Sequence, residues 1–375
     1  PTSNIRAAAE YDAAAALMRL EDWATAGNVL ESFRDAFPEH ELQRDATQQL
    51  AMVYQEDGQL SRSAAEYERV SAEAEDPQLS REALLLAGDL YEEAGAMASA
   101  LDVYQRYVTQ FPEPVEIAVE TRFKVAGMHK DAAAMELYYA QLREIVDIDS
   151  SAGEERTPRI RYLAAQSALV LAEDLFRQFD EVELMQPFEQ SLLEKQKRMD
   201  DALAALESLV DYEVGEVTAA ATFYIAEIYM GFSESLVTSE RPTDLGPAEL
   251  QDYELMIEEE AFPFEERSIE VHEKNLELMV AGLYNPWIER SLDKLADLMP
   301  GRYAKFEISS GFLDSIDSYA YQSPAVNETA VEEISDPPPA QDSADQPPAP
   351  AQDAEAKGEE GVAEVSSADE VATAG

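Results

Sequence analysis

Three histidines are the side chains of this sequence best suited to metal binding or acid–base catalysis. His40, His129 and His272 lie far apart in the chain, and none has a ligand-like neighbour at helical or Cys/His spacing. Only the fold could bring them together, so ordinary surface or packing roles are favoured. We therefore predict no catalytic, cofactor-binding or metal-binding residue among them.

The acidic run 147–153 ends in Gly153 and has the composition of a calcium-binding loop of the EF-hand kind. The glycine comes one residue too late, and Pro158 stands where the closing bidentate glutamate is needed. A connecting loop is the favoured interpretation.

Other patterns that enzymatic chemistry requires are missing from the sequence. It contains no cysteine, and no glycine-rich phosphate loop follows a strand. Glutamates 258–260 with Glu265 and Glu266 could bind cations or a basic partner, but acidic runs on helices are usually solvated faces. We predict a protein that is not an enzyme and binds no cofactor.

The charge of the chain is strongly one-sided, because 78 acidic residues stand against 27 basic ones in 375 residues. Phosphate binding requires clusters of Lys and Arg, so we expect no nucleic acid as a partner, whereas basic partners remain compatible. No run reaches the roughly 18 apolar residues of a membrane helix, so direct membrane insertion is not expected. The sequence leaves the oligomeric state open.

Three segments of the chain superimpose on one another at a spacing of 37 residues. Each carries a small residue, a large residue three positions later, a turn, and then a second small and a second large residue. Small residues let two helices approach closely, and large ones fill the groove beside them. The columns are Ala14/Ala51/Gly88, Leu17/Tyr54/Tyr91, Glu21/Gly58/Gly95, Ala26/Ser63/Ala100 and Leu30/Tyr67/Tyr104, with Pro38 and Pro112 closing the first and third copies. Such a two-helix unit cannot bury its apolar face alone, so the copies must stack into an α-solenoid.

We predict an all-α protein in three parts. Residues 1–147 hold the helix-pair repeats, residues 148–322 continue the solenoid as divergent helical repeats, and the Pro-, Ala- and acid-rich residues 323–375 form a disordered tail. The expected pairs cover 4–37, 41–75, 79–111 and, in degenerate form with a turn at Lys130-Asp131, 115–147. A polar connection at 148–158 precedes helices expected at 158–180, 187–212, 216–238, 248–260, 263–281 and 286–299, with a break at Phe262-Pro263-Phe264.

In a stack of helix pairs, the first helix of each pair lines the inner, concave face. The positions expected to be exposed there are apolar to acidic, and they lack the cationic and amide donors that hold a peptide carboxylate. Any bound protein or peptide segment should therefore be basic or apolar, and plain solvation of these positions is the alternative. The predicted first-helix surface consists of nine residues: Tyr11, Asp12, Arg19, Gln48, Met52, Gln55, Leu85, Asp89 and Glu92.

The repeat signature resembles the tetratricopeptide repeat. The third copy is the most similar, since it supplies the small, aromatic, turn, small, aromatic and closing positions in order: Gly88, Tyr91, Gly95, Ala100, Tyr104 and Pro112. The second copy matches at Ala51, Tyr54, Gly58 and Tyr67, departs at Ser63, and shares a period slightly longer than the usual 34. The resemblance implies a tetratricopeptide-like α-solenoid of stacked antiparallel helix pairs.

Three C-terminal stretches, 264–275, 284–288 and 300–305, resemble large proteobacterial tetratricopeptide proteins associated with TonB/Tol-type envelope energy transduction or gliding motility. The resemblance implies a periplasmic scaffold, with the cytoplasm as the alternative, and it transfers no functional residue. The chain opens at Pro1 without a methionine or a signal peptide. We interpret it as a fragment or processed form with further repeats upstream.

Two functions are compatible with these patterns. The first is a non-enzymatic protein–protein interaction scaffold in a bacterial envelope complex. The second is a peptide-binding or holdase-like chaperone module that grips basic or apolar segments.

Overall fold

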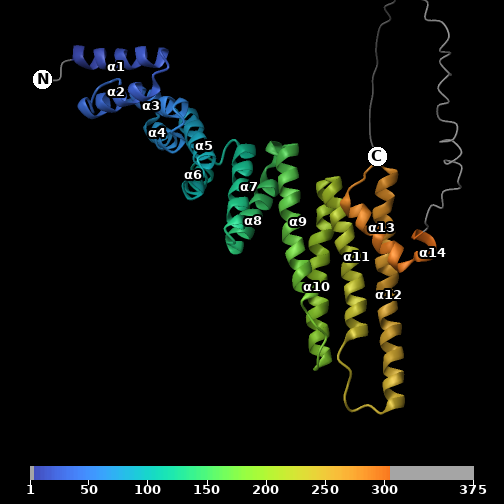
Figure 1. The fold of residues 1–375 in the computed structure, drawn as a ribbon. Helices are drawn as coiled ribbons and strands as arrows, with labels where there is room; N and C mark the ends of the chain where they lie inside the picture. The colour runs from blue at the N-terminus through green and yellow to red at the C-terminus, as the bar shows by residue number, and fades with distance from the viewer. Residues whose placement is uncertain (1–3, 305–375) are drawn as a thin grey trace, which may run out of the picture. The chain divides into compact units, whose positions relative to one another are not determined.

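The computed structural model describes residues 4–304 of the chain. Within this range the protein consists of helices without strands, and consecutive helices pack side by side (Figure 1). The predicted tail at 323–375 lies outside the described residues. The all-α class is confirmed for the part of the chain that the structure describes.

Eight helices of similar length form four consecutive pairs, as the repeat spacing predicts. Their bounds are α1 (Asn4–Arg19), α2 (Trp23–Ala36), α3 (Gln43–Glu56), α4 (Leu60–Glu73), α5 (Pro77–Glu93), α6 (Met97–Gln110), α7 (Val115–Asp131) and α8 (Met135–Ser151). Each helix packs on the one before it and the one after it, so the apolar face of every pair is buried by its neighbours.

A residue in the left-handed backbone conformation turns each pair at the same place in the repeat. Gly58 and Gly95 both have φ +73°, and Glu21 and Ala133 take this conformation in the first and fourth pairs with φ 57° and 55°. Glycine adopts it without a Cβ penalty, which explains the glycine column of the repeat. The predicted turn at Lys130-Asp131 is wrong, because α7 continues through both residues and the chain turns at Ala133.

The small-residue columns lie where helices approach most closely. Ala14, Ala51 and Ala100 are fully buried. At Gly88 a Cβ atom would lie 2.5 Å from Cε1 of Tyr104, so the tyrosine ring occupies the space of the missing side chain. The small and large positions of the signature therefore fill one another's space across each pair.

Four longer helices and then two shorter ones follow the four pairs in the described residues, and two of the longer helices are preceded by short 3₁₀ turns, Gly153–Glu155 and Leu209–Tyr212. Their bounds are α9 (Pro158–Asp180), α10 (Phe188–Ser208), α11 (Gly215–Thr238), α12 (Pro247–Val280), α13 (Pro286–Leu298) and α14 (Pro300–Tyr303). Helices α9 to α12 share one core that includes the buried rings of Phe179 and Phe232.

Two sequence-based boundaries in this region are wrong. The predicted connection at 148–158 is shorter, because α8 extends to Ser151 and the buried carboxylate of Asp149 is bound by Arg156 at 2.7 and 2.9 Å. The predicted break at 262–264 is absent, and α12 runs through Pro263 as one helix. Burial of Ala261 and the tilted packing of the Phe264 ring against Phe232, with ring centroids 4.6 Å apart, hold this segment against α11 despite the lost backbone bond.

None of the helices within residues 4–304 is both long enough and apolar enough to cross a membrane.

Candidate partner-binding surface

The structure divides the predicted first-helix surface into exposed and half-buried members. Exposed side chains are Asp12, Arg19, Gln48, Met52 and Asp89, whereas Tyr11, Gln55, Leu85 and Glu92 are half-buried. The expectation that all nine are exposed is therefore wrong for four of them.

Packing between neighbouring helices explains why the side chains of Tyr11 and Leu85 are half-buried. The ring of Tyr11 lies 5.9 Å from that of Phe33, and its hydroxyl accepts a hydrogen bond from Nε2 of Gln49 at 2.5 Å. Leu85 packs against the buried residues of the third pair. Both residues contribute to the core, which leaves Met52 as the exposed apolar member of the first-helix surface.

The two carboxylates of the third repeat are brought together with a lysine that the sequence did not place beside them. Nζ of Lys124, on α7, lies 2.9 Å from Asp89 and 3.1 Å from Glu92. The hydroxyl of Tyr104 donates to both carboxylates, at 2.6 and 2.8 Å. Burial, and then these two hydrogen bonds, raise the pKa of Tyr104. Lys124 therefore neutralises part of the negative charge at this end of the surface, which offers less free charge than its sequence indicates.

A hydrogen bond repeats with the 37-residue period and joins successive pairs. The hydroxyl of Tyr54 donates to Glu31, and the hydroxyl of Tyr91 donates to Glu68 at 2.8 Å. Each glutamate also binds an arginine from a following helix, Arg62 and Arg106 respectively. The aromatic column of the signature therefore links each pair to the preceding one, besides filling a groove.

Burial and the bond to Glu68 raise the pKa of Tyr91 to about 12, so the phenol stays protonated and donates at neutral pH. Sequence reasoning missed this link. Its signal was present, since Glu31 and Glu68 are themselves 37 residues apart.

In the fourth pair the tyrosine–glutamate link is replaced by a different polar contact. Gln105 occupies the position 37 residues after Glu68, and its Nε2 lies 3.2 Å from Nε2 of the buried His129. His129 therefore has a packing role. His40, half-buried, accepts a hydrogen bond at Nδ1 from the backbone of Leu42 at 3.2 Å.

The third histidine lies in a buried polar cluster that attaches α13 to the preceding helices. Nδ1 of His272 lies 3.2 Å from the hydroxyl oxygen of Ser291, and both side chains are fully buried. Nδ2 of Asn275 donates to the same hydroxyl at 2.8 Å and to the carbonyl of Ala219 at 3.0 Å. Residues of α11, α12 and α13 are thus joined through this one cluster.

Glu227 lies at the edge of this cluster, 3.3 Å from Nε2 of His272 and 2.7 Å from Nζ of Lys294. Burial alone would raise the pKa of Glu227, but the adjacent His272 ring and the hydrogen bond and charge of Lys294 hold the pKa below its usual range. Across residues 4–304, no group of histidine and acidic side chains is arranged to hold a metal ion.

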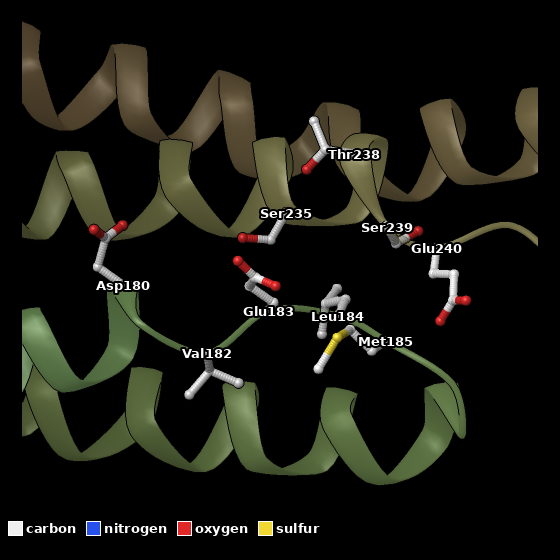
Figure 2. Close-up of a pocket in the computed structure, with 9 residues that line it drawn as sticks. All are labelled: Asp180, Val182, Glu183, Leu184, Met185, Ser235, Thr238, Ser239 and Glu240. Atoms are coloured by element: carbon white, nitrogen blue, oxygen red, sulfur yellow. The ribbon is translucent and has the colours of Figure 1, made fainter.

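A pocket of about 520 Å³ that the sequence did not predict lies between the α9–α10 connection and the end of α11 (Figure 2). Asp180, Glu183 and Glu240 contribute its carboxylates, and none of its lining residues is basic. In Figure 2 the carboxylate of Glu183 points toward Ser235. The Glu240 carboxylate already accepts a hydrogen bond from the backbone of Gln186 at 2.8 Å.

The comparisons with known proteins agree with the repeat pattern over one unit. Residues 82–114 match the tetratricopeptide repeat family. This segment covers most of α5 and all of α6, the pair that contains Gly88 and Tyr104. The tandem antiparallel pairs α1–α8, one of which carries this match, form a tetratricopeptide-like α-solenoid.

Solved structures give weaker likenesses. A tetratricopeptide repeat protein from Parabacteroides merdae is 14% identical and has a TM-score of 0.30, with 76% of this chain and 97% of that chain covered. A computationally designed self-assembling cyclic homooligomer is 14% identical, with coverages of 79% and 91% and a TM-score of 0.23. A circular tandem repeat protein is 15% identical, with coverages of 77% and 70% and a TM-score of 0.23. Scores this low carry no functional argument, and no curated protein matches the sequence.

Proposed function

We propose that the protein is a non-enzymatic scaffold that binds other proteins through its first-helix surface. The observation that carries the proposal is the combination of rigid repeats with exposed first-helix side chains. Tyr–Glu and Arg–Glu links join successive pairs, while Gln48 and Met52 of α3 remain exposed. A surface held in place by such links loses little conformational freedom when a partner binds.

The chemistry of the exposed members favours a basic or apolar partner segment. Arg19 is the only basic residue of the nine, and Met52 provides an apolar anchor with 41% of its surface exposed. Asp89 is already paired with Lys124, so the first two repeats carry the interaction. Affinity should come mainly from apolar contact, and the acidic surroundings should set partner choice and encounter rate.

The proposal includes membership of a bacterial envelope complex, of the TonB/Tol or motility kind, in the periplasm. Its support is the resemblance of residues 264–275, 284–288 and 300–305 to large proteobacterial tetratricopeptide proteins. Several residues of these stretches, His272, Asn275 and Trp287 among them, pack α13 against α11 and α12, so the resemblance concerns the architecture of this end.

A holdase-like chaperone is the second candidate. The observation that favours the chaperone is the acidic pocket at the α9–α10 connection, where the side chain of Met185 and three carboxylates lie together. Met185 has 55% of its surface exposed. Such a module would bind many unfolded basic segments with strong salt sensitivity.

Cross-linked affinity capture from a native envelope extract tests the proposal, with the full chain and its Met52→Ser variant as bait. Met135→Ser is the matched control, because Met135 is exposed to 40% but lies on a second helix. Tyr11 and Leu85 are left unchanged, since their substitution would disturb the core.

We expect a small set of folded envelope proteins that Met52→Ser loses and Met135→Ser retains. Capture of a broad set of unfolded or basic polypeptides, released by salt, would favour the chaperone. Equal capture by the two variants would show that the first-helix surface is not the binding site.

A further inference from the structure

Helix α12 has an outward face that no other helix covers along its first half. Its inner face packs on α11 through Ile257, Ala261 and Ser268, all buried. The shorter α13 packs beside the second half of α12, where His272 and Asn275 lie (Figure 1). Residues 247–266 are therefore covered on one side only within the described part of the chain.

Large apolar side chains lie on this uncovered face. Leu255 and Phe262 have 57% and 55% of their surfaces exposed, and they are seven residues apart, which places them two turns apart on one side of the helix. Neither residue lies on the α11 side, where Ile257 and Ala261 are buried. Exposed large apolar residues aligned in this way are typical of a docking surface for another helix.

Carboxylates flank the two apolar side chains. Glu258, Glu259 and Glu266 lie on the same exposed side, and residues 247–266 contain no lysine or arginine. Within residues 4–304 none of these three carboxylates forms an ion pair, in contrast to Glu31, which binds Arg62. We call Leu255, Phe262 and these three glutamates the α12 seam.

Pro263 removes one regular backbone hydrogen bond from the helix beside the seam. Proline has no N–H, so the backbone carbonyl of Glu259 lacks the donor that the fourth following residue supplies in a regular helix. This carbonyl lies between Leu255 and Phe262 along the chain. A cationic side chain seated beside Phe262 could donate to it and to a neighbouring carboxylate.

We propose that the α12 seam binds a basic amphipathic helix of another protein, with large apolar residues at heptad spacing and Lys or Arg beside them. The negative charge of the seam favours a basic partner over a second copy of the chain or its own C-terminal residues. A second copy would place the same unpaired glutamates against each other, and residues 305–375 of this chain contain only two basic residues, Lys305 and Lys357. The proposal is independent of the first-helix surface, and either can fail without the other.

A synthetic helical peptide tests the seam. The probe has about three heptads with leucine at the core positions and lysine on both flanks, and a charge-reversed version carries glutamate instead. Binding to the full chain is measured by fluorescence anisotropy at low and high salt. We expect the lysine peptide to bind and the glutamate peptide not to bind.

Two variants of the seam separate the apolar and the electrostatic contributions to binding of the lysine peptide. Leu255→Ser/Phe262→Ser should raise Kd for the lysine peptide at least about tenfold, because two desolvated anchors are lost. Glu258→Gln/Glu259→Gln/Glu266→Gln should raise Kd and weaken its dependence on salt. Leu193→Ser/Val280→Ser is the matched control, since these side chains are exposed to 62% and 91% but lie outside the seam, and it should leave Kd within about twofold.

Three results would overturn the proposal. The first is unchanged peptide affinity in Leu255→Ser/Phe262→Ser, and the second is equal binding of the two peptides. The third is a clear fall in Tm, or dissociation of a dimer in sedimentation, for that variant without peptide. A fall in Tm would show that another part of this chain already covers the seam. Dissociation of a dimer would show that a second copy covers it. Circular dichroism and Tm of every variant exclude unfolding as the cause of lost binding.

Discussion

Gly88 is the residue at which the repeat packs most tightly, because the Tyr104 ring fills the space of its missing Cβ atom. We expect Gly88→Ala to destabilise the protein by about 1–3 kcal/mol, since the ring must move within a buried core. Gly127→Ala is the control, because no atom lies within 4 Å of its added Cβ and alanine favours a helix. Urea unfolding of both variants measures the difference, and a neutral Gly88→Ala would contradict the packing described here.

Glu227 makes stability depend on pH in the acid range. Its pKa is lowered in the folded protein, where burial is outweighed by the adjacent His272 ring and by the hydrogen bond from Lys294. A lowered folded-state pKa contributes stability above the unfolded value, near 4.5, and this contribution is lost as pH falls through the folded value. Glu227→Gln should therefore lower Tm at neutral pH, and its difference from the unmodified protein should shrink below about pH 4.5.

Thermal unfolding from neutral to acid pH checks this expectation, with Glu234→Gln on the exposed side of the same helix as the control. A Tm difference for Glu227→Gln that stays constant with pH would show that the ion pair of Glu227 with Lys294 contributes nothing to the stability of the fold.

At the scale of the element, α13 depends on a few buried polar groups as well as on its buried apolar residues Ile288 and Leu295. Asn275→Ala leaves the carbonyl of Ala219 without its Asn275 donor, and Ser291 loses its Asn275 contact. Loss of a buried hydrogen-bond partner costs roughly 1–3 kcal/mol. Because repeat proteins can open locally, we expect the amides of α13 to lose protection from hydrogen exchange before those of α3 and α4.

Hydrogen exchange with mass spectrometry measures this local opening. Asn28→Ala, at an exposed position of α2, should leave the exchange of α13 unchanged. Equal loss of protection along the whole described chain in Asn275→Ala would mean that the repeats unfold as one unit.

At the scale of the whole molecule, the net charge of −51 opposes folding through self-repulsion. Added salt screens this repulsion, and the exposed ion pairs that salt also weakens contribute little each. We expect Tm to rise between about 0.02 and about 0.5 M NaCl, over which the Debye length falls several-fold. A Tm that falls with salt would show that ion pairs such as Arg34–Glu66, which is largely buried, dominate instead.

Local patterns in the sequence determined the fold of the four helix pairs. Ala14, Gly58, Tyr91 and their equivalents specify close approach, a left-handed turn and a filled groove, and each of these requirements acts between residues near one another in the chain. The pairs, the glycine turns and the all-α class could be predicted for that reason. Pro263 was misleading, because α12 tolerates one lost backbone bond where its neighbours pack on α11.

The tertiary structure alone decided which polar side chains meet. Lys124 neutralises Asp89 from a helix 35 residues later, and Glu227, His272 and Ser291 come together from three helices. Tyr11 and Leu85 are covered by neighbouring helices that helical periodicity within one segment does not show. Periodicity gives the face of a helix, whereas exposure and ion pairing depend on what the next helix places against that face.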